Sequence, residues 1–238
     1  MSLGVWSSEE NLNTARYYLG GGGSSLFAAS TGGRDDNPNI VGTTEEFLVA
    51  GNSWQTSNDL NTNREGLCAV FKPSGADIVG TSFNGYTGSH LTTTEEYDGT
   101  SWASSNGTNT LRSMGAGFAD PSLAVATGGQ NSGSNYVDDT EEYDGTCWTA
   151  AYGLNTARRF LAGCGTQTAG LSFGGEESGP TTSNKTEEYD GSSWSNGSNL
   201  NTAREKLAGN GSQSAGISYG GDDGSDSDVT EEYDGVSW

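Results

Sequence analysis

The chain has 238 residues and a formal net charge of −21, with 38 glycines and only 4 prolines. Six Trp, ten Tyr and seven Phe at regular places argue against disorder, and so acidic a surface repels nucleic acid and anionic membranes. The sequence lacks an apolar run of about 18 residues, and its start, MSLGVWSSEE, does not read as a signal peptide. We therefore expect no nucleic-acid partner and no membrane insertion.

Aromatic and basic residues recur with a common period along the chain. The tryptophans, at Trp6, Trp54, Trp102, Trp148, Trp194 and Trp238, are separated by 48, 48, 46, 46 and 44 residues. An arginine keeps the same spacing, at Arg16, Arg64, Arg112, Arg158 and Arg204. A period of this length indicates a propeller or a solenoid. The units expected in chain order are 7–54, 55–102, 103–148, 149–194 and 195–238, together forming one domain over 1–238.

Each unit reads as four short strands, and the fourth unit shows them best. We expect strands at Phe160–Gly165 and at Gly170–Phe173, the second ended by a Gly-Gly pair, then a third at Thr186–Tyr189 and a fourth through Trp194. Between the last two, Asp190-Gly191 is typical of a tight hairpin turn. No segment has a convincing helical period.

The second and fifth units differ from this pattern. The second has about four additional residues around Lys72–Asp77, judged against the spacing of the other units. The fifth ends at Trp238, just as its fourth strand begins. We expect the N-terminal Leu3–Ser8 to pair with Thr230–Tyr233 and close the ring, leaving Val236–Trp238 displaced.

The hexapeptide TEEYDG appears four times, and a variant, TEEFLVAG, begins at Thr44. Because alternate residues of a strand share a face, the first Glu lies on the same side as the Tyr, and a buried carboxylate needs a partner. We expect it to pair with the repeated arginine, while the second Glu is solvated. The residues assigned to structure are the five arginines, Trp54, Trp102, Trp148, Trp194, Glu45, Glu95, Glu141, Glu187 and Glu231.

These repeats resemble kelch-type β-propeller blades. The matching features in the fourth unit are the Gly174-Gly175 pair, Tyr189 of the third strand and Trp194 of the fourth. The sequence pattern NTAR…LAGxGTQTAGLxFGG…TEEYDGSSW is similar to that of kelch-like proteins encoded by marine bacteriophages and found in ocean environmental sequence. The resemblance implies an all-β, five-bladed kelch-type propeller with four antiparallel strands per blade, in a virion-associated or extracellular protein.

Catalytic constellations are missing from the sequence. His90 is the only histidine, and no CxxC pair, HExxH motif or phosphate loop accompanies it. The three cysteines, Cys68, Cys147 and Cys164, have no disulfide spacing and are expected to be small packed thiols. We therefore expect a protein that is not an enzyme.

The units differ most in the segment after the Gly-Gly pair: residues 34–43, 86–93, 130–139, 176–185 and 222–229. Variable loops on a rigid scaffold are where recognition is usually placed, although solvated loops also drift freely. The candidate binding residues are Arg34, Asp35, Asp36, Tyr86, His90, Asn135, Tyr136, Glu176, Asn184 and Asp222. All five loops should emerge on one face of the ring.

The last of these loops suggests a metal site. Asp222, Asp223, Asp226 and Asp228 place four carboxylates in seven residues, and clustered oxygen ligands suit Ca²⁺. The alternative is a solvated acidic loop. No other cofactor is expected.

Three functions remain open at this point. The resemblance implies a non-enzymatic binding or structural module of a phage virion or tail, whose partner is a glycan or protein on a host or virion surface. A carbohydrate-active hydrolase would need only a carboxylate pair at a set separation. A self-assembling scaffold is the third candidate.

Overall fold

The computed structural model describes residues 10–24, 27–48, 51–75 and 77–238. These residues contain strands and turns and no helix, so none of them forms a helix able to span a membrane. They form seven antiparallel sheets, of which four have four strands, two have three and one has two.

Five of these sheets follow the sequence repeat, and we number them one to five. The first contains β2 (Gly20–Gly23), β3 (Phe27–Thr31), β5 (Thr44–Leu48) and β6 (Ser53–Ser57). The second contains β7 (Cys68–Ser74), β8 (Asp77–Phe83), β9 (Thr94–Tyr97) and β10 (Trp102–Ser105). The third contains β11 (Ala116–Asp120), β12 (Leu123–Thr127), β13 (Thr140–Tyr143) and β14 (Trp148–Ala151). The fourth contains β16 (Ala162–Thr166), β17 (Ala169–Phe173), β20 (Thr186–Tyr189) and β21 (Trp194–Asn196). The fifth contains β22 (Ala208–Ser212), β23 (Ala215–Tyr219) and β24 (Thr230–Tyr233).

The two small sheets involve the segments that precede a first strand. One joins β1 (Arg16–Tyr17) to β4 (Arg34–Asp35). The other joins β15 (Arg158–Arg159), β18 (Glu176–Glu177) and β19 (Thr181–Thr182). They tie the loop after a Gly-Gly pair to the segment that leads into the same sheet.

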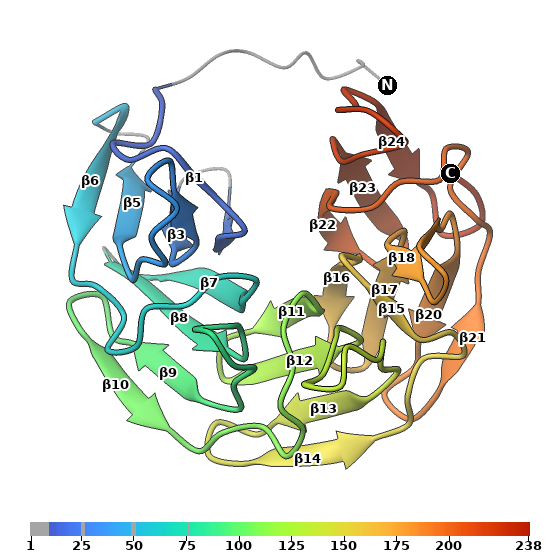
Figure 1. The fold of residues 1–238 in the computed structure, drawn as a ribbon, viewed down its shortest axis with the longest axis horizontal. Coiled ribbons are helices and arrows are strands. Elements are labelled where there is room, and N and C mark those ends of the chain that lie inside the picture. Colours follow the sequence, from blue (N-terminus) through green and yellow to red (C-terminus); the bar gives the residue numbers. More distant parts are fainter. Residues whose placement is uncertain (1–9, 25–26, 49–50, 76) are drawn as a thin grey trace.

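The five sheets stand around a common axis, with their innermost strands towards the centre (Figure 1). The innermost strands contact one another in sequence, from β2 through β7, β11 and β16 to β22. Radially arranged four-stranded antiparallel sheets are the architecture of a β-propeller. We call each sheet, with the segment that leads into its first strand, a unit.

Glycine allows the innermost strands to approach one another. A Cβ placed on Gly117 would lie 2.7 Å from the Cβ of Cys68 in the neighbouring unit, and one on Gly209 would lie 2.2 Å from the Phe173 ring. Both distances are shorter than van der Waals contact, so these positions accept only glycine without rearrangement. Aromatic rings fill the wider spaces further out, as where Phe83 packs on Trp148 with centroids 4.8 Å apart.

Three sequence expectations need correction or remain open. The first strand of the fourth unit begins at Ala162, because Phe160 has a left-handed φ of 54° that cannot continue a strand. Trp238 is not displaced: its indole N–H donates to Thr186 Oγ1 at 2.9 Å, and its ring packs on Phe173. Leu3–Ser8 lies outside the described residues.

Each unit contains a buried Arg–Glu pair. The pairs are Arg16–Glu45 at 3.1 Å, Arg64–Glu95, Arg112–Glu141 at 2.9 Å, Arg158–Glu187 at 2.9 Å and Arg204–Glu231 at 3.0 Å. In the fourth unit Arg158 also donates to the carbonyls of Gly174 and Lys185, and Glu187 accepts the backbone N–H of Asn155. One ion pair thus joins the ends of two strands to the segment that leads into the sheet.

A second set of contacts joins each unit to the next. In four units the indole N–H of the regularly spaced tryptophan donates to the Oγ1 of the threonine that begins the TEE segment of the preceding unit, at 2.9–3.0 Å. These hydrogen bonds run from Trp102 to Thr44, Trp148 to Thr94, Trp194 to Thr140 and Trp238 to Thr186. The tyrosine of TEEY donates to the second Glu of the preceding unit, from Tyr97 to Glu46, Tyr143 to Glu96, Tyr189 to Glu142 and Tyr233 to Glu188. The expectation that the second Glu is solvated is therefore wrong for these four residues, which are half-buried acceptors.

The ion pair yields a first prediction. Glu187→Ala leaves the fully buried Arg158 without its counter-charge, which should lower the free energy of unfolding by about 3–5 kcal/mol. Asp223→Asn removes a carboxylate from an exposed loop and should change it by less than about 0.5 kcal/mol. Urea unfolding measures both, and equal midpoints for the two variants would contradict a structural role for the pair.

The inter-unit tyrosines yield a second prediction. Burial, reinforced by the hydrogen bond to Glu96, raises the pKa of Tyr143 to about 12, and Tyr233 beside Glu188 behaves alike. The folded pKa is above the unfolded value of about 10, so the neutral tyrosine stabilises the folded state. This contribution to stability is complete below pH 10 and is lost as the pH rises towards 12. Tyr143→Phe should flatten the fall of the urea midpoint between pH 10 and 12, and Tyr152→Phe, at an exposed tyrosine, should not. An unchanged slope in Tyr143→Phe would refute this account.

Candidate functional site

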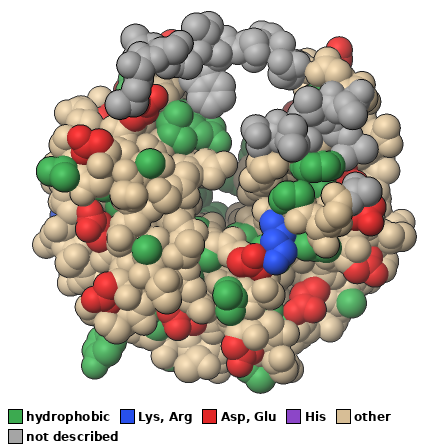
Figure 2. Space-filling model, turned by 180° about the vertical axis from the view of Figure 1, so that it is seen from behind, with side chains coloured by type: hydrophobic (Ala, Val, Ile, Leu, Met, Phe, Trp, Pro, Cys, Tyr) green, Lys and Arg blue, Asp and Glu red, His purple; other side chains and the backbone are tan. Residues whose placement is uncertain are grey.

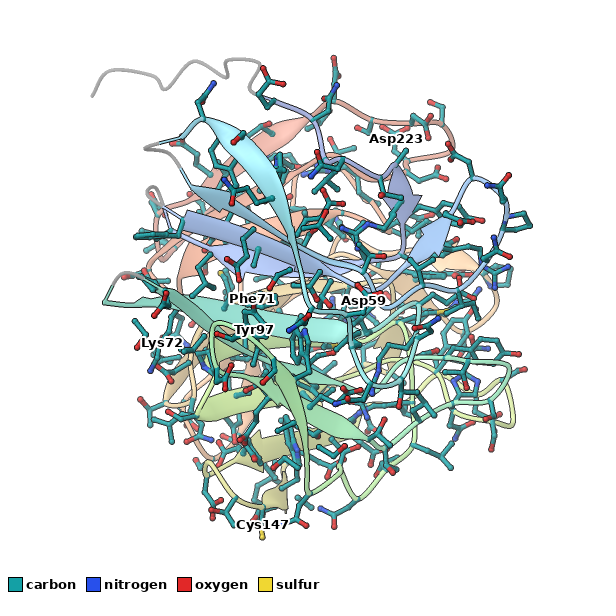
Figure 3. All side chains as sticks on the ribbon, turned by 90° about the vertical axis from the view of Figure 1, so that its left-hand side faces the viewer. Asp59, Phe71, Lys72, Tyr97, Cys147 and Asp223 are labelled. Carbon is teal, nitrogen blue, oxygen red and sulfur yellow. The ribbon has the colours of Figure 1, made fainter. Side chains whose placement is uncertain are left out.

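The connections between second and third strands all reach one face of the ring, which we call the loop face. The tight turns between first and second strands reach the opposite face, which we call the hairpin face. Figure 3 shows Asp223 of the last loop and Lys72 of the lengthened β7–β8 hairpin on opposite sides of the molecule. On the face shown in Figure 2, acidic side chains are spread around the ring, whereas basic ones gather in one place.

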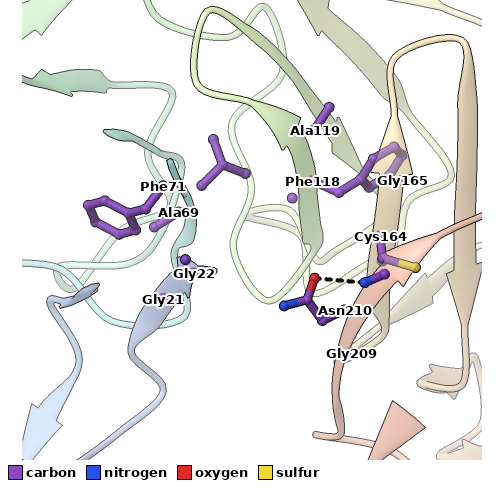
Figure 4. Close-up of a pocket in the computed structure, with 15 residues that line it drawn as sticks. Gly21, Gly22, Ala69, Phe71, Phe118, Ala119, Cys164, Gly165, Gly209 and Asn210 are labelled. Atoms are coloured by element: carbon purple, nitrogen blue, oxygen red, sulfur yellow. Dashed lines mark hydrogen bonds between the residues drawn. The ribbon is translucent and has the colours of Figure 1, made fainter. Parts of the chain in front are cut away.

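The axis of the ring holds a channel lined by the innermost strands. Figure 4 shows the end of it formed by the middle and final residues of these strands, where the lining is mainly Gly and Ala with Phe71, Phe118 and Asn210. Asn210 Oδ1 accepts the backbone N–H of Gly211 at 2.7 Å. This part of the channel offers backbone and small side chains and no cluster of reactive groups.

A hollow of about 380 Å³ lies at the loop-face end of the same channel. Its lining includes one residue from each unit at the same repeat position, two residues after the arginine: Tyr18, Gly66, Met114, Phe160 and Lys206. These five have φ values of 54–61°, in the left-handed region that disfavours large side chains. The strained backbone of the four non-glycine residues must be held by its surroundings.

Backbone hydrogen bonds between units hold this ring. The N–H of Gly66 donates to the Tyr18 carbonyl, Met114 to Gly66, Phe160 to Met114 and Lys206 to Phe160, at 2.7–2.9 Å. The backbone is therefore constant around the hollow while the side chains differ, as expected of a scaffold that presents variable groups.

Aromatic rings and a cation form the floor of the hollow. Tyr18 belongs to the first unit and Phe160 to the fourth, and their rings stack with centroids 5.9 Å apart. The Tyr18 side chain is 37% exposed. Lys206 Nζ lies 5.4 Å from the Phe160 centroid, and the Arg159 guanidinium lies 4.8 Å from it. Aromatic faces with a few fixed polar groups are typical of small-ligand sites.

The variable loops contact residues that precede the hollow positions in the chain. Glu176 is 4% exposed, receives the Tyr136 hydroxyl at 2.9 Å and pairs with Arg159 at 2.8 Å. Arg34 of the first loop donates to Glu65 of the second unit at 2.6 Å. These candidate binding residues thus lock one unit to another.

The remaining loop candidates are placed differently. His90 accepts or donates a hydrogen bond with Ser113 Oγ at 3.0 Å and packs against the Tyr86 ring, and burial lowers its pKa. The Asn184 amide donates to the Leu200 carbonyl at 3.1 Å, and Asp35 accepts backbone N–H groups of its own loop. Asp36 and Asn135 are exposed. The sequence analysis did not identify Tyr18 or Phe160 as candidate binding residues. The feature that could have identified them is their shared position two residues after the repeated arginine.

In the part of the chain that the structure describes, Cys68, Cys164 and Glu176 do not have the pKa shifts that catalytic groups need. Burial raises the pKa of Cys68 and of Cys164 to about 12, so neither is a thiolate nucleophile near neutral pH. Burial alone would raise the pKa of Glu176, but hydrogen bonds from Arg159 and Tyr136 lower it overall. A general acid of a glycosidase needs the opposite shift.

Among the candidate calcium ligands, an isolated backbone bridge joins Asp222 to Asp226. Asp222 accepts the Gly224 N–H at 2.8 Å and lies 3.6 Å from Lys206, while Asp223, Asp226 and Asp228 are exposed. Among the residues that the structure describes, no group of three or more acidic, His or Cys side chains is arranged to hold a metal ion.

Comparisons with known proteins bear on the fold. No family model and no curated protein matches the chain. The structure of YjhT is similar to it with a TM-score of 0.73 at 10% sequence identity, covering 91% of this chain and 80% of that one. The fold is a β-propeller. β-Propellers include enzymes as well as binding proteins, so the fold alone assigns no activity.

The acidic loop yields a third prediction. Ca²⁺ and Mg²⁺ at matched ionic strength should raise the melting temperature equally, because they screen the net charge of −21 without a specific site. Thermal unfolding with each salt measures the shifts. A larger shift with Ca²⁺ that disappears in Asp226→Asn would restore the calcium site.

Proposed function

We propose that the protein is a five-bladed, kelch-type β-propeller that acts as a non-enzymatic binding module on a phage virion or tail. Its ligand is a glycan of the host surface, bound at the hollow on the loop face. The resemblance of the repeat to kelch-like proteins of marine bacteriophages supports the setting.

The observation that carries the proposal is the ring of equivalent positions around the hollow. Their backbone is constant, yet they present Tyr18, Met114, Phe160 and Lys206 in one unit or another. A half-exposed aromatic pair beside a cation can pack on the apolar face of a sugar ring while Lys206 donates hydrogen bonds.

The alternative of a hydrolase has less support. Three carboxylates next to the hollow positions are ion-paired: Glu65 with Arg34, Glu176 with Arg159 and Glu205 with Lys206. Despite burial, hydrogen bonds from Arg159 and Tyr136 lower the pKa of Glu176, which opposes general acid catalysis by this carboxyl.

A glycan-array screen with two matched variants tests the proposal. Tyr18→Gly and Phe160→Gly take the residue that Gly66 already has at this position, so the left-handed backbone is kept and only the ring is lost. Each should weaken glycan binding at least tenfold, whereas Tyr152→Ala, at an exposed tyrosine outside the hollow, should leave it unchanged.

Three outcomes oppose the proposal. Equal binding by all variants would remove the hollow from the site. Binding of a virion protein and of no glycan would assign the loop face to protein recognition. Release of shortened sugars by the wild-type chain would favour the hydrolase.

A further inference from the structure

A glutamine in the turn between the first and second strands joins each of the last two units to the unit before it. Gln167 of the fourth unit donates its side-chain amide to the Tyr143 carbonyl of the third unit at 3.0 Å. Gln213 of the fifth unit donates to the carbonyls of Tyr189, at 2.8 Å, and of Gly170, at 3.1 Å, in the fourth unit. The carbonyl of the TEEY tyrosine is therefore a place where a carboxamide binds between two units.

The third unit has a proline at the same position of its turn. Pro121 follows the last residue of β11, just as Gln167 follows the last residue of β16. Proline has no side-chain donor, and no side chain of the described residues donates to the carbonyl of Tyr97, which corresponds to Tyr143. The carboxamide that binds at the next two junctions is thus missing between the second and third units.

A hollow of about 220 Å³ lies between these two units, and we call it the junction hollow. Its walls include Lys72, Glu96 and Tyr97 of the second unit and Pro121 and Ser122 of the third. Lys72 and Tyr97 lie close together in Figure 3. The junction hollow therefore combines the residue that would carry the glutamine with the tyrosine that would receive its amide.

Other contacts hold the second and third units together. Lys72, from the lengthened hairpin of the second unit, donates to both carboxylate oxygens of Asp120 at 2.7 and 2.8 Å. The Thr81 hydroxyl donates to the Pro121 carbonyl at 2.8 Å. A ligand can therefore enter the junction hollow without replacing a contact on which this junction depends.

The charges around the junction hollow favour a hydrogen-bond donor that carries no negative charge. Glu96, which accepts the Tyr143 hydroxyl, and the Tyr97 carbonyl are both acceptors. The Lys72 ammonium is already paired with Asp120. A carboxylate entering the hollow would meet the like charge of Glu96, whereas a carboxamide of the same shape would donate to these acceptors.

We propose that the junction hollow binds the carboxamide of a glutamine side chain presented by a peptide or protein partner. The side chain donates to the Tyr97 carbonyl, as Gln167 and Gln213 do at the next two junctions. Ser122 at the edge of the hollow is exposed, so the side chain enters from solvent, and Pro121 packs on its methylene groups.

NMR titration with the tripeptides Gly-Gln-Gly and Gly-Glu-Gly tests the proposal, because the two peptides differ only in the carboxamide. Gly-Gln-Gly should shift the backbone amide signals of Thr81, Glu96 and Ser122, and Gly-Glu-Gly should bind at least tenfold more weakly. Pro121→Gln supplies the side chain from within the chain, in a turn that already accepts glutamine in two units, and should weaken binding of Gly-Gln-Gly at least tenfold. Pro121→Ala leaves the hollow open and is the matched control, which should bind as the wild-type chain does.

Acetamide distinguishes a peptide ligand from a free amide. It should shift the same signals but bind more weakly than Gly-Gln-Gly, because it lacks the methylene groups and the peptide backbone. The proposal is overturned if Gly-Gln-Gly shifts no signal around the hollow, if the two tripeptides bind equally, or if Pro121→Gln binds as well as Pro121→Ala. Equal affinity for acetamide and Gly-Gln-Gly would assign the hollow to free amides and would also overturn it.

Discussion

The buried arginine–glutamate pair is the interaction on which the rest of the structure depends. In the fourth unit its guanidinium donates hydrogen bonds to two carbonyls, at the end of the second strand and the start of the third. Its carboxylate accepts a backbone N–H that precedes the first strand. A charge so deeply buried is tolerable only when it is paired with an opposite charge and hydrogen-bonded. The pair therefore does more than hold two side chains together, because it sets where each sheet begins and where its central hairpin opens into a loop.

That placement explains the geometry of the loop face. Since the arginine is held, the residue two positions later must turn with a left-handed φ to enter the first strand, and it does so in all five units. The side chains of four of these residues, Tyr18, Met114, Phe160 and Lys206, then line the same hollow, and the fifth position is Gly66. The chemistry of the hollow can therefore change at these positions without altering the fold.

The junctions between units use another set of groups from the same hexapeptide. In TEEY the first Glu stabilises its own unit, while the Thr, the second Glu and the Tyr contact neighbouring units. The residues of TEEY have structural contacts in most units, and a fivefold ligand site is not needed to account for the repetition.

The sequence by itself determined the repeat, the strands at TEEY, the turns at Gly-Gly and Asp-Gly, and the pairing of the repeated arginine with the first Glu. These follow from periodicity and from the alternation of side chains along a strand, which are local properties. Only the tertiary structure decided the contacts from Tyr189 to Glu142 and from Trp194 to Thr140. Each contact joins residues about one repeat apart, and the sequence does not reveal whether a side chain contacts the preceding unit or the following one. It also decided that Arg34, Tyr136 and Glu176 bind other units, and that Tyr18 and Phe160 meet across the axis, since loop variability does not distinguish a free side chain from one that holds a neighbour.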